Sequence, residues 1–144
     1  GWACDLVVDS GRALLASAGG DMRSASAETI AELADPQLGT VAARVSVGVG
    51  ALATSSVAKR RWQVGSGYAH HIIDPRTGAP AASPIVAASV TAATAVAAEA
   101  AAKCVLLMGT RGLAWADQQD WIRGAVAFWD TGAVFATRSV ELAA

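Results

Sequence analysis

The residues with the clearest capacity for chemistry lie between Tyr68 and Pro80. This stretch contains both histidines, the only tyrosine and two of the four prolines of the chain. An imidazole changes its charge near neutral pH, so it can take up or release a proton there. The alternative interpretation is a strand followed by a tight turn, with one buried histidine that is hydrogen-bonded and one that is exposed.

Two short elements must position these histidines. Tyr68–Ile73 is predicted to be a strand, and Asp74–Gly78 is predicted to be a turn. The turn contains a proline that fixes φ, an aspartate that can bond the following backbone, and a glycine that accepts a positive φ. On a strand, His70 and His71 would point to opposite faces, so at most one of them would face a given ligand.

The run His71–Pro80, H-I-I-D-P-R-T-G-A-P, resembles the signature of the FAD:protein FMN transferases, the ApbE family. Further stretches resemble the family in the same order along the chain: Gly1-Trp2-Ala3 with Asp5, Gly19-Gly20-Asp21, Asp35-Pro36, and Ala51–Ser56 followed by Arg60. The resemblance covers almost the whole chain but only the second half of the family's usual length. Residues 1–144 are therefore expected to form a single, partial flavin-transferase-like domain.

The resemblance implies roles for several residues of this sequence. His71 matches the motif histidine and is the candidate general base. Ile73 matches a position that touches FAD, and Tyr68 and Arg76 are expected to line the same site. Asp74 is expected to order the turn rather than to react.

A second motif implied by the resemblance lies in the run Ala98–Gly109. In the family this helix carries an aspartate and a threonine that help to hold Mg²⁺ against the diphosphate of FAD, and here Glu99 and Lys103 take their places. Positions four apart share one helix face, so an ordinary Glu–Lys pair is the alternative interpretation. An ammonium supplies no ligand oxygen, which argues against a normal Mg²⁺ site, but it can stand beside phosphate as a point charge.

The activity implied by the resemblance is the transfer of FMN from FAD to a Ser or Thr hydroxyl of a target protein, with release of AMP. FAD, an acceptor protein and a segment or chain that supplies the absent first half are the implied partners. The alternatives are a non-catalytic member of the family that binds a nucleotide or a protein, and a structural subunit that pairs with the absent half.

Composition narrows the class of protein. The chain has 144 residues, of which 53% are hydrophobic and 16% are charged, and a net charge of −1. These values predict one globular domain and give no basic stripe for nucleic acid. The apolar region Ile85–Met108 contains Glu99 and Lys103 and is predicted to be a buried core segment rather than a membrane span. Cys4 and Cys104 form neither a metal-ligand pair nor a disulfide framework by spacing.

The N-terminal residues contain no signal peptide, which suggests a fragment or a processed product, and both an extracytoplasmic and a cytoplasmic location stay open.

The remaining patterns predict an α+β fold, with helices packed on one side of a mainly antiparallel sheet, as in the ApbE family. Helices are expected at Trp2–Leu15, Ala95–Met108 with Gly109 as its cap, and Arg111–Gln118, and a strand at Ile85–Thr94. The resemblance implies that a core strand ends at Gly19-Gly20-Asp21, after the run Leu14–Ala18. Ser24–Pro36 is expected to be a short helical or irregular connection. Hairpins are expected at Gly39–Ser56, turning at residues 48–50, and from Ala125–Trp129 to Ala133–Val140.

Overall fold

A computed structural model describes residues 1–138 and 140 of the chain. Its helices and strands follow one another in this order: α1 (Trp2–Asp9), β1 (Leu15–Ala18), β2 (Asp21–Ser24), β3 (Ile30–Ala34), β4 (Val41–Ser46), β5 (Gly50–Ser56), β6 (Arg61–Val64), β7 (Gly67–His70), β8 (Ile85–Ala92), α2 (Ala95–Met108), a 3₁₀ turn (Gly109–Arg111), α3 (Gly112–Ala116), β9 (Ile122–Trp129) and β10 (Val134–Ala136).

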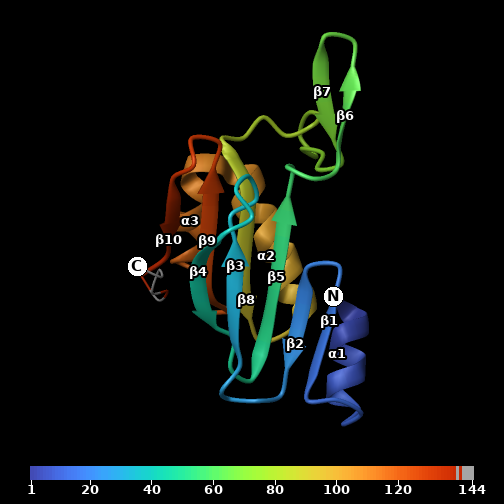
Figure 1. Ribbon diagram of the computed structural model, residues 1–144, viewed down its shortest axis with the longest axis vertical. Coiled ribbons are helices and arrows are strands. Elements are labelled where there is room, and N and C mark those ends of the chain that lie inside the picture. The colour runs from blue at the N-terminus through green and yellow to red at the C-terminus, as the bar shows by residue number, and fades with distance from the viewer. Residues whose placement is uncertain (139, 141–144) are drawn as a thin grey trace.

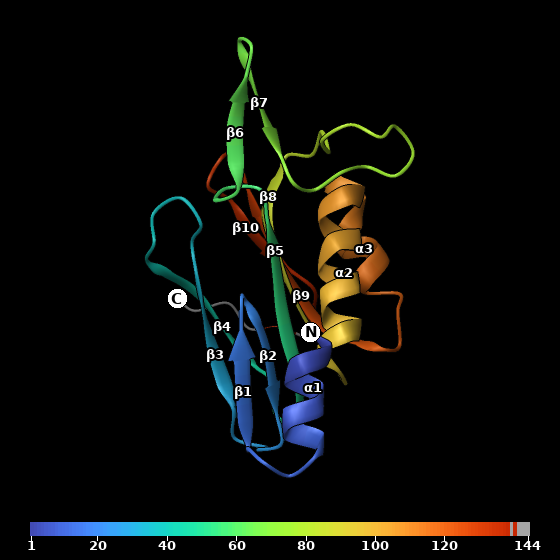
Figure 2. The ribbon, with the colours of Figure 1, turned by 90° about the vertical axis from the view of Figure 1, so that its right-hand side faces the viewer.

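The central element is a six-stranded sheet in the order β1-β2-β5-β8-β9-β10, in which every neighbouring pair is antiparallel. The three helices lie on one face of this sheet, and the β3–β4 ribbon covers the other (Figures 1 and 2). The prediction of an α+β fold with helices on one side is therefore confirmed.

The core between sheet and helices is built largely from small residues. Ala98, Ala101 and Ala102 of α2 are fully buried against β5, β8 and β9 together with Val105 and Leu106. Alanines let the helix backbone approach the sheet closely, and each fully buried Val or Leu adds about 1.5–3 kcal/mol. This packing fixes the rotation of α2 and leaves its other face free. No helix among the described residues is long and apolar enough to cross a membrane.

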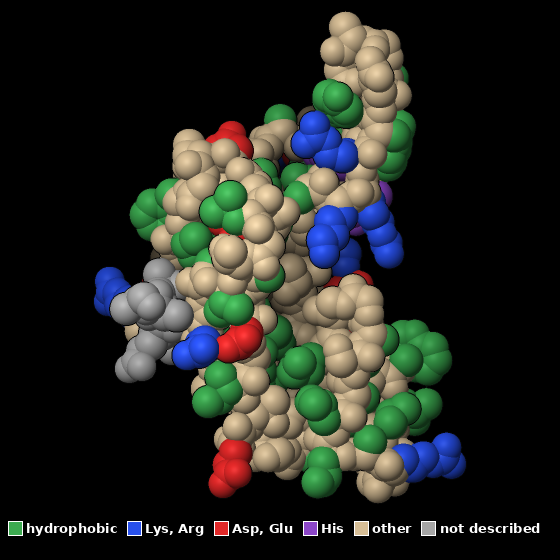
Figure 3. Space-filling model, viewed as in Figure 1, with side chains coloured by type: hydrophobic (Ala, Val, Ile, Leu, Met, Phe, Trp, Pro, Cys, Tyr) green, Lys and Arg blue, Asp and Glu red, His purple; other side chains and the backbone are tan. Residues whose placement is uncertain are grey.

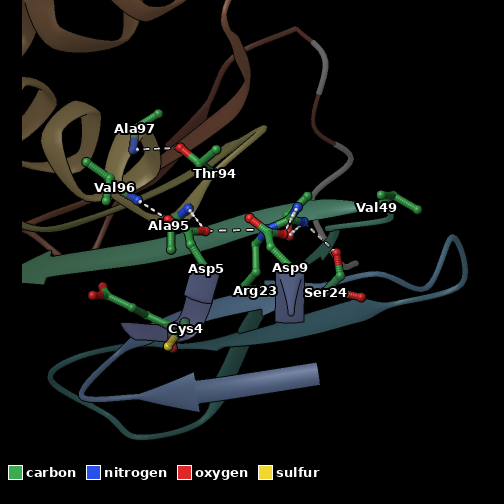
Figure 4. Close-up of polar contacts among 12 residues, drawn as sticks. Cys4, Asp5, Asp9, Arg23, Ser24, Val49, Thr94, Ala95, Val96 and Ala97 are labelled. Atoms are coloured by element: carbon green, nitrogen blue, oxygen red, sulfur yellow. Dashed lines mark hydrogen bonds and ion pairs between the residues drawn. The ribbon is translucent and has the colours of Figure 1, made fainter. Parts of the chain in front are cut away.

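The first turn of α2 is tied to the N-terminal part of the chain (Figure 4). The amides of Ala95 and Val96 donate to the carboxylate of Asp5 over 2.8 and 3.2 Å, and Thr94 caps the same helix end. Arg23 of β2 places its Nε 3.4 Å from Asp5. Because Asp5 lies on α1, these contacts hold α1, β2 and α2 together.

The predicted helix Trp2–Leu15 is wrong in its C-terminal half. The helix α1 ends at Asp9, and Gly11 follows with a φ of 71°, its amide donating to the Val8 carbonyl over 2.9 Å. A glycine in this conformation ends a helix without steric cost, so the chain turns back and Leu15 begins β1.

The interpretation of Ser24–Pro36 as a helical or irregular connection is also wrong, because it contains β3. The predicted hairpin Gly39–Ser56 contains two real strands, but β4 pairs with β3, while β5 pairs with β2 and β8. The amides of Val47 and Gly48 both donate to the Thr29 carbonyl, over 2.9 and 3.1 Å. These bonds direct the chain out of the ribbon and into the central sheet.

The predicted strand Tyr68–Ile73 is observed as a shorter strand, β7, which ends at His70. β7 pairs with β6, a strand that was not predicted from the sequence. The two strands form a ribbon that projects from the body of the molecule, with mostly exposed side chains (Figure 1). His71 therefore lies at the base of the ribbon, between the last strand residue and the turn.

The C-terminal half agrees more closely with the prediction. The helix Ala95–Met108 is confirmed, and Gly109 follows it with a φ of 59°. The predicted helix Arg111–Gln118 is observed as the 3₁₀ turn and α3 together. The strand predicted at residues 85–94 ends at Ala92, and β9 and β10 form the expected hairpin. Residue 139 of the predicted last strand lies outside the described residues.

Candidate functional site

A groove of about 710 Å³ lies where β5 extends beyond the β1–β2 hairpin (Figure 3). Asp21 at the start of β2 pairs with Ala53, whereas β5 continues to Ser56. Thr54 still bonds to the Gly20 carbonyl, so the sheet is open on one side of the last two residues, Ser55 and Ser56. The groove is lined by the glycine turn before β2, the turn after β3, the end of β5, the segments before and after the β6–β7 ribbon, and α2.

The end of β5 brings hydroxyl groups and a free strand edge to the groove. The Thr54 amide donates to the Gly20 carbonyl over 3.2 Å, so it points toward the β2 side. Since amide directions alternate along a strand, the Ser56 amide points to the same side, beyond the end of β2. Thr54 shares a 2.8 Å hydrogen bond with Ser89. This edge therefore offers a backbone donor to a ligand.

His71 lines the groove, and one of its ring nitrogens is already engaged. Its Nδ1 lies 3.3 Å from the carbonyl oxygen of Arg60. A carbonyl can only accept, so in the neutral ring this contact requires the proton on Nδ1 and leaves the lone pair of Nε2 available. The ring of His70 bonds instead to the Ala81 carbonyl over 3.2 Å, and His70 does not line the groove.

Three cationic side chains line the groove. Lys59 and Arg60 come from the segment between β5 and β6, and Lys103 comes from α2. Among the described residues, Lys59 and Arg60 have no ion pair. Figure 3 shows Lys and Arg side chains gathered at the base of the β6–β7 ribbon, above the hollow. Cations without a carboxylate partner favour an anion in this part of the groove.

Glu99 and Lys103 form an ion pair on the groove side of α2. The Lys103 Nζ lies 2.7 Å from Glu99 Oε1, and their side chains are 44% and 42% exposed. The hydrogen bond from Lys103 lowers the pKa of Glu99 below its usual value, although partial burial acts in the opposite direction. At this exposure the pair adds only about 0.3–0.5 kcal/mol to stability.

The two residues do not fit Mg²⁺ as a pair. Mg²⁺ requires oxygen ligands in near-octahedral geometry, and of these two side chains only Glu99 has them. One of its oxygens already accepts from Lys103. Asp21 also lines the groove, but no group of three or more His, Cys, Asp or Glu residues in the described part of the chain could hold a metal ion.

The predicted turn Asp74–Gly78 is confirmed. The amides of Thr77 and Gly78 donate to the Asp74 carbonyl over 3.2 and 2.8 Å, and Gly78 has a φ of 69°. The Arg76 amide and side chain both donate to the Asp74 carboxylate, which lowers the pKa of Asp74. Asp74 therefore orders the turn, as expected.

The structure does not bring every predicted site residue to the groove. His71, Glu99 and Lys103 line it, whereas Ile73, Tyr68 and Arg76 do not. Tyr68 is 67% exposed on the β6–β7 ribbon, with the Arg61 guanidinium 4.4 Å from the centre of its ring. The FAD contacts expected of Ile73, Tyr68 and Arg76 stay predictions.

From the sequence, Lys59 was given no role and Arg60 was named only as part of the family resemblance, yet both side chains line the groove. The hydroxyl-rich Thr54–Ser56 just before them was the signal, because a short connection places the two cations beside those hydroxyls. Asp35 was named only as part of the Asp35-Pro36 resemblance, yet it also lines the groove, and its Oδ1 accepts from two backbone amides of the following turn.

The sequence of residues 1–126 matches the sequence model of the ApbE family. The chain belongs to the ApbE family. Curated proteins gave no significant match. Solved ApbE structures share the fold, including the ApbE protein of Thermotoga maritima, which is 24% identical with a TM-score of 0.74 over 87% of this chain and 42% of that one.

Two flavin transferases are similar over more of the chain. The flavin transferase ApbE of Vibrio cholerae is 26% identical with a TM-score of 0.73, covering 96% of this chain and 48% of its own. The apo flavinyl transferase ApbE of Pseudomonas stutzeri is 21% identical with a TM-score of 0.75, covering 96% and 47%. This ApbE chain thus spans less than half the length of these solved relatives.

Proposed function

We propose that this chain supplies the nucleotide groove of a flavin transferase, which moves FMN from FAD to a Ser or Thr hydroxyl of a target protein and releases AMP. The observation that carries the proposal is the position of His71 beside two unpaired cations, in a chain of the ApbE family. Residues 1–144 would act as one partial domain, completed by a further segment or a partner chain.

The proposed reaction is a phosphoryl transfer in which His71 handles the proton. The acceptor oxygen forms a bond to the FMN phosphorus while the bond from that phosphorus to the bridging oxygen breaks, and AMP leaves with the electron pair. The hydroxyl proton passes to Nε2 of His71, the nitrogen left free by the contact with Arg60. Lys59 and Arg60 offset the negative charge that spreads over the phosphoryl oxygens.

FAD would have to reach beyond the groove to contact Ile73, Tyr68 and Arg76, as the resemblance implies. Tyr68 lies on β7, Ile73 lies just before the turn and Arg76 lies in the turn, and none of them lines the groove. Part of the FAD molecule would therefore extend from the groove toward the base of the β6–β7 ribbon.

The test is an FMN-transfer assay in which labelling of an acceptor protein is followed by in-gel flavin fluorescence. The reaction contains FAD, the chain, the N-terminal half of a solved ApbE relative and an acceptor domain modified by that relative. His71→Ala is expected to lower the labelling rate by about 10²–10⁴-fold, the usual contribution of a general base. His70→Ala removes an imidazole outside the groove and serves as the matched control.

Equal labelling by the wild type and by His71→Ala would contradict the role of His71. Absence of labelling together with tight FAD binding would favour the second candidate, a family member that binds a nucleotide without catalysis. The Glu99–Lys103 ion pair is the observation that favours this candidate, because it stands where the family's metal ligands are expected.

A further inference from the structure

The part of the groove beside His71 carries positive side chains that have no carboxylate partner. Lys59 and Arg60 have no ion pair within the described part of the chain, and Lys103 shares its charge with Glu99 alone. Three carboxylates also line the groove, Glu99, Asp21 and Asp35, and the N-terminal ammonium lies 2.8 Å from Asp21 and 3.8 Å from Glu99. The two cations without a carboxylate partner can therefore face the two negative charges of an ionised diphosphate diester. Asp21 and Asp35 lie on the walls formed by the two turns, and the Asp35 carboxylate already accepts from two amides.

The position of Lys103 is fixed by the packing of its helix, α2. Its neighbours on α2, Ala101 and Ala102, are buried against the sheet, so the rotation of the helix directs Lys103 away from the core and along the groove. An ammonium has three donors, of which Glu99 uses one at 2.7 Å. The other two can bond phosphate oxygens while the contact with Glu99 persists.

We propose that this groove binds a diphosphate without a divalent metal ion, and that Lys103 Nζ is the cation beside the diphosphate. Lys59 and Arg60 complete the anion site from the other side, and the backbone donor at the end of β5 adds to it. The inference rests on the proposed function for the identity of the ligand, FAD. The claim that no metal ion is needed rests on Lys103, which stands in the groove and has no oxygen to bind a metal ion.

The experiment is a titration of the chain with FAD and, separately, with ADP, each in excess EDTA and in excess MgCl₂, followed by calorimetry. The wild type is expected to bind with the same affinity, within about twofold, in both buffers. Lys103→Gln should weaken binding in EDTA by roughly tenfold to a hundredfold, as expected for the loss of a charge-assisted hydrogen bond. Arg44→Gln, which breaks an exposed Arg–Glu pair outside the groove, should bind like the wild type.

A double variant, Glu99→Asp with Lys103→Thr, provides oxygen ligands at both positions. It should bind FAD more tightly in MgCl₂ than in EDTA, and circular dichroism would check that it is folded. Wild-type binding only in MgCl₂ would overturn the inference and leave the proposed function in place. Unchanged binding by Lys103→Gln in EDTA would overturn the role of Lys103. No binding of FAD or ADP in either buffer would overturn the inference for this chain, and the transfer assay with the N-terminal half present would then decide the proposed function alone.

Discussion

The hydrogen bond between His71 and the Arg60 carbonyl shows how a single contact can prepare a side chain for chemistry. It holds the ring by Nδ1, and in the neutral ring it leaves the lone pair on Nε2 available. Arg60 thus contributes twice, through its backbone to the orientation of the histidine and through its side chain to the charge of the groove. The neighbouring His70 has the same ring but a different carbonyl partner and lies outside the groove.

The ion pair of Glu99 and Lys103 predicts a dependence of stability on pH. The hydrogen bond from Lys103 lowers the folded-state pKa of Glu99 below its usual 4.5. The pair therefore stabilises the fold above that value and loses its contribution as the pH falls through the folded-state pKa. Lys103→Gln should raise the pKa of Glu99 and lower stability by about 0.3–0.5 kcal/mol at neutral pH, with no difference in strong acid.

Carboxyl chemical shifts of Glu99 followed against pH by NMR would measure this change, and urea unfolding at neutral and acidic pH would measure the stability. Arg44→Gln again provides the control, because it leaves Glu99 and its partner unchanged. The same Glu99 titration curve in the wild type and in Lys103→Gln would show that the pair does not form in solution.

At the scale of elements, the position of α2 depends on a residue that lies ninety positions earlier in the sequence. Asp5 accepts from the amides of Ala95 and Val96 and lies beside the guanidinium of Arg23 (Figure 4). An acidic group at a helix N-terminus is favourable because it meets unpaired amides and the positive end of the helix dipole. This contact therefore helps to set where Glu99 and Lys103 stand.

Asp5→Ala is expected to destabilise the fold by about 1–2 kcal/mol, since it removes two hydrogen bonds from amides at the start of α2. Urea denaturation followed by circular dichroism would measure the loss. Asp9→Ala removes an acidic residue of α1 whose bond is to Arg23 alone and should cost less. A loss for Asp5→Ala no larger than that for Asp9→Ala would mean that the contact with α2 contributes nothing.

Elements with local signals could be predicted from the sequence, whereas those set by long-range pairing could not. The helix α2 has a threonine cap before it and a glycine after it, and the Asp74 turn has its own proline and glycine. The strand β3 was missed although Ala31 and Leu33 are buried and their neighbours exposed, because five residues give a weak alternation. The pairing of β5 with β2 and β8 depends on register between distant segments.

The residues of the groove could likewise be predicted only in part from the sequence. His71, Glu99 and Lys103 could be selected because each lies in a motif of the chain that resembles the family. In the folded chain these residues line the same groove as Asp35, Lys59 and the turn at Gly20, because β5 continues beyond the point where β2 begins. The spacing of these residues along the sequence does not predict that they lie together.

At the scale of the whole molecule, apolar side chains gather on α1 and the edge strand β1. Trp2, Leu6, Leu14 and Leu15 are all at least half exposed, on or next to these two elements. Figure 3 shows hydrophobic side chains at the lower right of the molecule, where α1 and β1 lie in Figure 1. Exposed apolar surface next to a free strand edge favours association.

We therefore predict that the chain self-associates as its concentration rises. Sedimentation velocity would measure this association, and Leu6→Glu with Leu15→Glu should weaken it because the added carboxylates repel one another at the contact. Ile30→Glu with Val41→Glu on the β3–β4 ribbon is the matched control. A purely monomeric wild type at all concentrations would contradict the prediction.

The central claim, that the groove at the end of β5 receives FAD, is tested most directly by NMR. Amide shifts of the labelled chain would be followed during titration with FAD, once in EDTA and once in MgCl₂. The largest changes are expected at Gly20, Ser56, Arg60, His71 and Lys103, which surround the groove. Changes confined to the second hollow, between α3 and β9, or no changes at saturating FAD in either buffer, would contradict the claim.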